Sequence, residues 1–186
     1  DSKDGGCDLF GPSGESGESG TNIYVSFYGH KSARIYVKCE QMDVNGEMAI
    51  LAKDDDVVAG DETSATVLAD RPIEGVTNAQ FDVSYDSSVF EILGVEIINP
   101  ELFIKSTEGF FSYDITNPDV ITFSLTENIM PINLVGPLVK INLLAKQDSP
   151  TIWDTTNLRL KEDSSFYNEL GQQLNVCLGG NCSIFI

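Results

Sequence analysis

The sequence predicts an all-β protein, an antiparallel β-sandwich or jelly roll of eight or more short strands with an additional β-hairpin near its N-terminus. Short segments in which polar and apolar residues alternate recur along the chain, and Gly, Pro, Asn and Asp interrupt them at intervals of about ten residues. Apolar residues make up 41% of the 186 residues and include ten Phe, six Tyr and one Trp. The chain therefore has enough apolar side chains for a substantial core, unlike a disordered acidic segment.

Composition divides the chain into three parts. Residues 1–20 are rich in Gly, Ser and acidic residues, and the repeat "GESGESG" is typical of a flexible linker. Residues 21–46 contain two alternating runs joined at "YGHKSA", which indicates a β-hairpin. His30 is the only histidine, and it falls in this turn, where we interpret it as a solvated turn residue. Residues 47–186 are predicted to form the β-sandwich domain.

Alternation predicts the strands of the sandwich. The clearest example has Phe81, Val83 and Tyr85 on a core face and Gln80, Asp82 and Ser84 on the opposite face. The segment 164–171, "SSFYNELG", is the only helical candidate. The other predicted strands lie at Met48–Ala52, Ala65–Ala69, 89–98, 110–115, 121–127, 136–146, Leu158–Leu160 and Leu174–Val176.

The charge of the chain restricts its partners. Eleven basic and 29 acidic residues give a formal net charge of −18, which repels the phosphates of nucleic acids and of anionic membranes. No segment approaches the roughly 18 consecutive apolar residues of a membrane helix. The first residues also lack the basic and apolar regions of an export signal, so we expect a processed chain that is not embedded in a membrane.

An acidic tract precedes the second predicted strand of the sandwich. Asp54, Asp55, Asp56, Asp61 and Glu62 offer oxygen ligands that could gather calcium, although the spacing lacks the D-x-[DN]-x-[DN]-G pattern of a calcium loop. The alternative is a solvated edge whose charges prevent strand pairing with another chain, and we favour it. We therefore predict no metal site and no cofactor, with calcium as the open alternative.

The four cysteines are Cys7, Cys39, Cys177 and Cys182. The segment "CLGGNC" closes a very short loop in which two Gly and an Asn supply the positive φ angles of a tight turn. We expect a Cys177–Cys182 disulfide and, by elimination, a Cys7–Cys39 disulfide. A metal site and free thiols are the alternatives. Disulfides would indicate an oxidising compartment, so we expect an extracellular or cell-surface location.

Catalytic motifs are not found. The chain has one histidine, no G-x-S-x-G sequence, no cluster of metal ligands and no phosphate-binding glycine loop. Glycoside hydrolysis by a carboxylate pair requires no motif, but 29 acidic residues make such pairs inevitable by chance. We predict that the protein is not an enzyme.

The order of these elements resembles a cohesin module over about residues 47–177. The "AGD" turn, the strand "FDVSYD" and the apolar strand "VFEI" follow one another as in the opening half of that family. The segments "DVITFSLTEN" and "GPLVKINLLAK" are similar to its fifth and sixth strands, and "GQQLNV" to its last strand.

The resemblance implies a nine-stranded jelly roll that binds dockerin helices on the flat face formed by strands three, five, six and eight. Asn78 matches the third-strand Asn that meets the dockerin, and Glu127 matches the acidic residue that ends the fifth strand. Gln80 stands where the family has an acidic residue, so a hydrogen bond is retained but its charge is lost. Ser84 lies on the same polar face, which also carries Asp82, Ser124 and Thr126.

We therefore predict a non-catalytic extracellular recognition or scaffold module that binds a dockerin-like protein partner or a polysaccharide at the cell surface. The partner-binding candidates are Asn78, Gln80, Ser84 and Glu127. The alternative is a structural subunit of an extracellular filament, pilus or S-layer-like array that assembles by strand exchange between neighbouring subunits. The extra hairpin and the apolar C-terminal "SIFI" motivate it. Carbohydrate platforms could be built from Tyr24, Tyr28, Tyr36 and Trp153.

Overall fold

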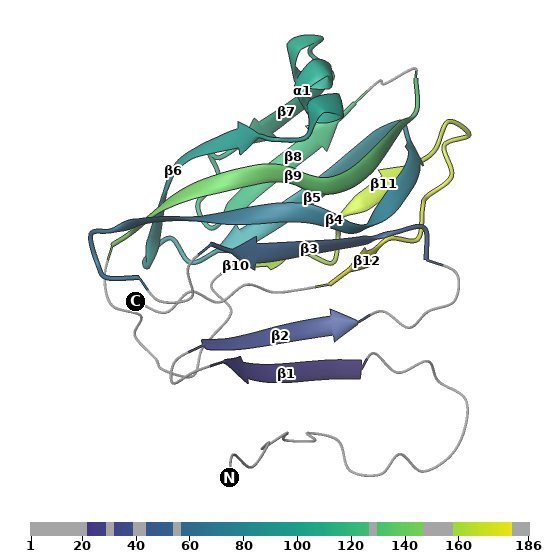
Figure 1. Cartoon of the computed structure of the whole chain (residues 1–186). Coiled ribbons are helices and arrows are strands. Elements are labelled where there is room, and N and C mark those ends of the chain that lie inside the picture. Colours follow the sequence, from purple (N-terminus) through teal and green to yellow (C-terminus); the bar gives the residue numbers. More distant parts are fainter. Residues whose placement is uncertain are drawn as a thin grey trace, which may run out of the picture.

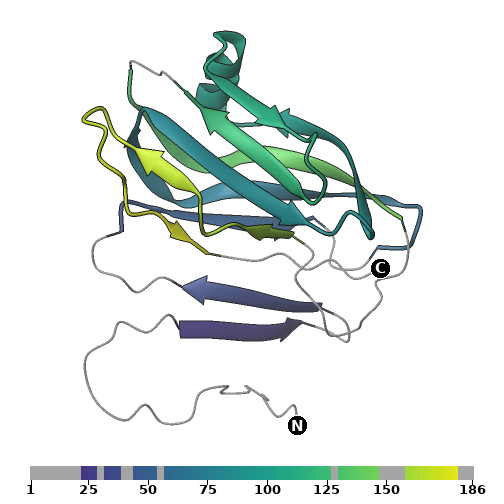
Figure 2. The ribbon, with the colours of Figure 1, turned by 180° about the vertical axis from the view of Figure 1, so that it is seen from behind.

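The computed structural model of the chain describes residues 22–28, 32–38, 44–53, 57–126, 130–146 and 158–179, the first two ranges by their backbone only. These residues form two five-stranded sheets and a separate two-stranded hairpin. Figures 1 and 2 show the two five-stranded sheets stacked on each other. The all-β sandwich predicted from alternation is therefore confirmed.

We name each large sheet after a central strand. The β4 sheet runs in the order β12 (Cys177–Leu178), β3 (Glu47–Ala52), β4 (Glu62–Val76), β9 (Ile132–Ala145) and β6 (Phe90–Ile97). In the β5 sheet, β10 (Leu158–Leu160) and β11 (Ser165–Tyr167) both pair with one side of β5 (Asn78–Tyr85), and β8 (Val120–Leu125) and β7 (Phe111–Asp114) follow on the other side. The β12–β3 pairing is parallel, and the other pairings of the described strands are antiparallel.

The core lies between the inner faces of the two sheets. Phe81 and Val83 are fully buried, and Tyr85 packs against the core, as their alternation in the sequence predicts. A row of stacked phenylalanine rings crosses the β5 sheet from β11 to β7. Ring centroids are 6.2 Å apart between Phe166 and Phe81, 4.8 Å between Phe81 and Phe123, and 6.4 Å between Phe123 and Phe111. This aromatic row holds four neighbouring strands in one layer.

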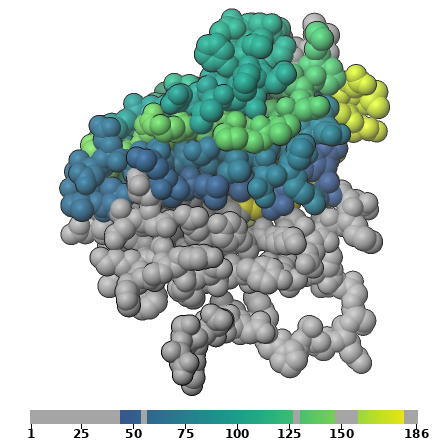
Figure 3. Space-filling model, in the orientation of Figure 1, coloured from purple at the N-terminus to yellow at the C-terminus, as the bar shows by residue number. Residues whose placement is uncertain are grey.

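One helix was not predicted. Helix α1 (Pro100–Thr107) follows β6 and projects beyond the sheet ends, at the top of Figure 3. Its N-cap is Asn99, whose Oδ1 accepts hydrogen bonds from the backbone N–H of Glu101 and Leu102. The Asn99 amide also donates to the carbonyl of Val135 at 3.1 Å, and Asn99 is buried. The Asn-Pro-Glu sequence is a helix start signal, but only a strand was predicted here, from the apolar run that precedes this sequence.

Two predicted elements are wrong. The helical candidate 164–171 is instead β11 followed by a turn, because Phe166 joins the aromatic row and Asn168 Oδ1 accepts from the N–H of Leu170 and Gln172. The predicted strand Leu174–Val176 is not a strand. Pairing with β3 begins only at Cys177, where β12 starts.

The predicted N-terminal hairpin is confirmed at the level of the backbone. β1 (Asn22–Tyr28) pairs antiparallel with β2 (Ser32–Lys38), with Asn22 opposite Lys38 and Tyr28 opposite Ser32. His30 and residues 1–20 lie outside the described residues. The division into parts 1–20, 21–46 and 47–186 stays a prediction.

The remaining sequence predictions concern metals, cysteines and membranes. Among the described residues no group of three or more His, Cys, Asp or Glu is placed to hold a metal ion, and Asp54–Asp56 of the acidic tract lie outside that part. Cys177 is disulfide-bonded, but Cys7, Cys39 and Cys182 lie outside the described residues, so the pairing stays a prediction. None of the helices in the described part of the chain has the length and apolar character needed to cross a membrane.

Candidate functional site

The outer face of the β5 sheet gathers the candidate residues that the structure describes. Alternate residues of β5 point away from the core, so Asn78, Gln80 and Ser84 share this face. Asn78 and Gln80 are exposed, and Ser84 is half-buried. Glu127 lies outside the described residues, so its role stays a prediction. We call the outward residues of β11, β5, β8 and β7, apart from the apolar Val120, the polar face: Tyr167, Ser165, Asn78, Gln80, Asp82, Ser84, Thr122, Ser124, Ser112 and Asp114.

The strand register arranges the polar face in rows. Ser165 lies opposite Gln80, Gln80 opposite Ser124, and Ser124 opposite Ser112. Strands are about 4.8 Å apart, so hydroxyl and amide groups recur at that spacing across four strands. The aromatic row packs behind the same strands and makes this layer rigid. The polar face can therefore present hydrogen-bonding groups in fixed positions, with little conformational entropy to lose when a partner binds.

The predicted residues differ in how free they are to meet a partner. The Gln80 side chain makes no hydrogen bond within the described part of the chain, where it is exposed. The Ser84 hydroxyl donates to the carbonyl of Arg159 on β10 at 3.3 Å, so it also holds two strands together. Thr126 is exposed directly after β8, and its N–H donates to the carbonyl of Phe110.

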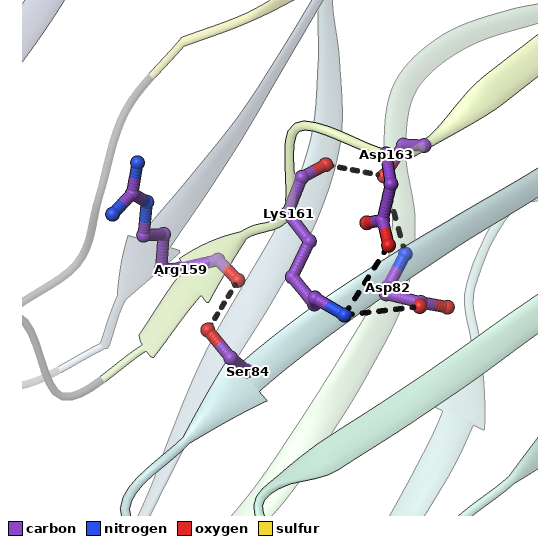
Figure 4. A network of polar contacts seen from close by, with 6 residues as sticks. Asp82, Ser84, Arg159, Lys161 and Asp163 are labelled. Atoms are coloured by element: carbon purple, nitrogen blue, oxygen red, sulfur yellow. Dashed lines mark hydrogen bonds and ion pairs between the residues drawn. The ribbon is translucent and has the colours of Figure 1, made fainter.

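Asp82 was predicted to be solvent-exposed on this face, and that prediction is wrong. Asp82 is only 8% exposed, because residues 161–164 form a turn between β10 and β11 that covers it. The N–H of Lys161 donates to the Asp82 carbonyl at 2.9 Å, and the Asp82 N–H donates to the Ser164 hydroxyl at 3.3 Å. We call residues 161–164 the covering turn; Figure 4 shows it beside Asp82.

The covering turn brings charged groups that the sequence analysis did not select. The Lys161 ammonium lies 3.3 Å from Asp163 Oδ2 and 3.8 Å from Asp82 Oδ2 (Figure 4). Oδ1 of Asp82 is buried and has no hydrogen-bond partner among the described residues. A signal for the turn does exist: in "LRLKEDSSF" a polar segment separates the alternating Leu158 and Leu160 from Phe166.

Acidic side chains gather where turns connect the strands at one end of the sandwich. Asp119 lies before β8 with a φ of 69°, and its Oδ1 accepts from the N–H of Ser87 at 2.9 Å. Hydrogen bonds from the Ser87 side chain and backbone hold the pKa of Asp119 below its ordinary value. Hydrogen bonds from the Thr116 backbone and hydroxyl lower the pKa of Asp114 in the same way. Both carboxylates therefore favour the ionised state in the folded chain.

These pKa directions predict a sensitivity to acid. The folded-state pKa of Asp119 lies below the ordinary value of 3.8, so its contribution to stability is complete above that pH and is lost as the pH falls through the folded-state pKa. Asparagine tolerates the left-handed backbone at this position. We therefore expect the free energy of unfolding of Asp119→Asn to fall less between about pH 6 and about pH 2.5 than that of the natural chain. Urea denaturation at both pH values measures this, and equal losses would contradict it.

Comparisons with known proteins identify the architecture. The family model described as the cohesin domain matches residues 48–177. The solution structure of CaCohA2 from Clostridium acetobutylicum is similar to this chain with a TM-score of 0.58 and 15% identity, covering 77% of this chain and 92% of that one. The OlpC cohesin of Clostridium thermocellum, solved in a complex with the dockerin Doc435, has a TM-score of 0.55 and 19% identity and covers 78% and 98%.

An archaeal cohesin has the same fold. The non-cellulosomal cohesin of the hyperthermophile Archaeoglobus fulgidus is 16% identical, with a TM-score of 0.52 and coverage of 75% of this chain and 92% of that one. A search of curated proteins found no match. At these identities the solved structures show the shared fold, and the family follows from the sequence model, which matches well over half of the chain. The chain belongs to the cohesin family.

Proposed function

We propose that this chain is a non-catalytic recognition module that binds a dockerin-like protein partner on the polar face. The observation that carries the proposal is the row formed by Ser165, Gln80, Ser124 and Ser112 across a rigid layer of four strands. Membership of the cohesin family supports it, as does the OlpC relative, which was solved in a complex with a dockerin. The predicted residues Asn78, Gln80 and Ser84 lie on this face, and Glu127 is proposed to belong to it.

A protein partner fits the polar face better than a polysaccharide does. Carbohydrate-binding surfaces usually present aromatic rings to the sugar faces, whereas Tyr167 is the aromatic residue of the polar face and it is half-buried. The small hydroxyl and amide groups of the face instead permit close approach of a partner backbone or helix. We propose an extracellular or cell-surface location for this recognition, in keeping with the disulfides predicted from the sequence.

The proposal is tested with a displayed library of dockerin modules, followed by calorimetry on each dockerin that binds. We expect the double change Asn78→Ala and Gln80→Ala to weaken binding about tenfold to a hundredfold, because both exposed side chains lie on β5, the strand between β11 and β8 in this sheet. The control is Glu62→Ala with Glu91→Ala, two exposed residues on the outer face of the β4 sheet, which should leave the affinity unchanged.

Three outcomes would contradict the proposal. One is that no dockerin of the library binds, and another is that the control change weakens binding as much as the change on the polar face. The third is assembly of the purified chain into long oligomers in sedimentation experiments, which would support the alternative of a filament subunit.

A further inference from the structure

The fold does not require a buried carboxylate at Asp82. It lies on the outer side of β5, in one row with Thr122 of β8 and Asp114 of β7. Its side chain keeps 11% of its surface accessible, Oδ1 is buried without a partner, and the carboxylate accepts no hydrogen bond within the described part of the chain. A buried carboxylate without hydrogen bonds is costly, so its presence calls for a specific reason.

Anchoring the covering turn is not that reason. The turn is held by the backbone of Asp82, through the Lys161 N–H to the carbonyl at 2.9 Å and through the Asp82 N–H to Ser164. Within the turn, the Ser164 hydroxyl and N–H both donate to the Lys161 carbonyl, at 2.7 and 3.2 Å. All of these bonds would remain if the Asp82 carboxylate were replaced by a neutral group.

The ion pair with Lys161 does not compensate for the burial either. The Lys161 ammonium is 3.8 Å from Asp82 Oδ2, which is too long for a hydrogen bond, and it lies closer to Asp163, at 3.3 Å. Asp163 is well exposed, and Lys161 keeps 37% of its side-chain surface accessible. An exposed pair of this kind holds its lysine weakly. The Lys161 ammonium can therefore move away from Asp82 into solvent at little cost.

We propose that Asp82 is the acceptor for a cationic side chain, arginine or lysine, of the bound partner, and that Lys161 is an intramolecular competitor which this cation displaces. The inference rests on the proposed function, because Asp82 belongs to the polar face. Carboxylate oxygens can only accept hydrogen bonds, and the guanidinium or ammonium of a partner can donate a charge-assisted hydrogen bond to Oδ2, the oxygen that faces Lys161. The net charge of −18 attracts a cationic partner surface over a longer range. Asp82 is thus a specificity-determining residue for partners that carry a cation at this position.

The first experiment compares three variants against a dockerin that binds the natural chain. Asp82→Asn keeps the shape and removes the charge, and we expect its thermal stability to be equal or higher and its affinity to fall about tenfold to a hundredfold. Lys161→Met keeps most of the apolar stem and removes the competing ammonium, so the affinity should rise severalfold. The matched control is Asp70→Asn, an exposed acid on β4 of the other sheet and outside the polar face, which should change the affinity less than threefold.

The second experiment needs no dockerin. N-acetyl-arginine amide, used as the probe, is titrated into isotope-labelled protein while the backbone amide signals of Asp82, Lys161 and Ser164 are followed. We expect saturable shifts of these signals in the natural chain, a lower apparent dissociation constant in Lys161→Met, and loss of the shifts in Asp82→Asn.

The two experiments separate this inference from the proposed function. Saturable arginine binding that depends on Asp82, with no dockerin bound from the library, would support the Asp82 acceptor and contradict the proposed function. Dockerin binding that is undiminished in Asp82→Asn would overturn the Asp82 acceptor and leave the proposed function standing. A large loss of thermal stability in Asp82→Asn would assign the carboxylate a structural role and also overturn the inference.

Discussion

Replacing Phe123 with alanine is expected to lower the free energy of unfolding by about 4 kcal/mol. The Phe123 side chain is fully buried at the centre of the aromatic row, with ring contacts to Phe81, Phe111 and Tyr113. Its removal leaves a cavity between strands β5, β8 and β7, and the stacked rings on either side cannot collapse into it without shifting these strands. Chemical denaturation monitored by far-ultraviolet circular dichroism measures the loss in the free energy of unfolding.

The control for this change is Phe103→Ala. Phe103 lies on α1 and is 57% exposed, so the same substitution removes an equal side chain from a position that creates no buried cavity. We expect a loss of less than about 1 kcal/mol there. Similar losses at Phe103 and Phe123 would contradict the role assigned to the aromatic row.

The second large effect is expected for Gly46→Ala, at about 3 kcal/mol. Gly46 precedes β3 with a φ of 142°, a conformation that residues with a side chain rarely adopt. A Cβ atom here would lie 2.5 Å from Ile73 Cγ1 and 2.7 Å from the carbonyl oxygen of Pro72, both on β4. The two strands would have to separate, and the hydrogen bond from the Cys177 N–H to the Gly46 carbonyl would be disturbed.

Gly75→Ala separates the two causes of this loss. Gly75 has a φ of 71°, but apart from its chain neighbours no atom of the described residues lies within 4 Å of a Cβ placed there. The change therefore introduces backbone strain without overpacking, and we expect it to cost about 1 kcal/mol. Thermal or urea denaturation of both variants under one set of conditions measures the difference. Equal losses would show that the close approach of Gly46 to β4 is unimportant.

Most of the strands could be predicted because one face of each strand is buried and the other is polar. Alternation located β5 and its core residues Phe81 and Val83, and it also located β3, β4 and β8. It failed where long-range pairing decides the structure. Ser165–Tyr167 is a strand because Phe166 fits the aromatic row beside Phe81, and no local pattern in "SSFYNELG" reveals that neighbour.

The strand and the face of the candidate site could be predicted from the sequence, but the covering turn could not. The period of two places Asn78, Gln80 and Ser84 together on the outside of β5 without knowledge of any other strand. The same period also predicted that Asp82 is exposed to solvent. It is buried because residues about 80 positions further along the chain return as the covering turn, and a contact between such distant segments leaves no trace in either segment alone.

The parallel pairing of β12 with β3 joins segments from opposite ends of the sandwich domain, with Cys177 beside Glu47. A ribosome synthesises Glu47 long before Cys177, so this ladder cannot form until nearly the whole domain has left the exit tunnel. Closing so long a loop is slow, and the incomplete intermediate would leave apolar surface open to chaperones and to other nascent chains in the meantime. Efficient production of this module therefore depends on protection during translation as well as on the stability of the finished fold.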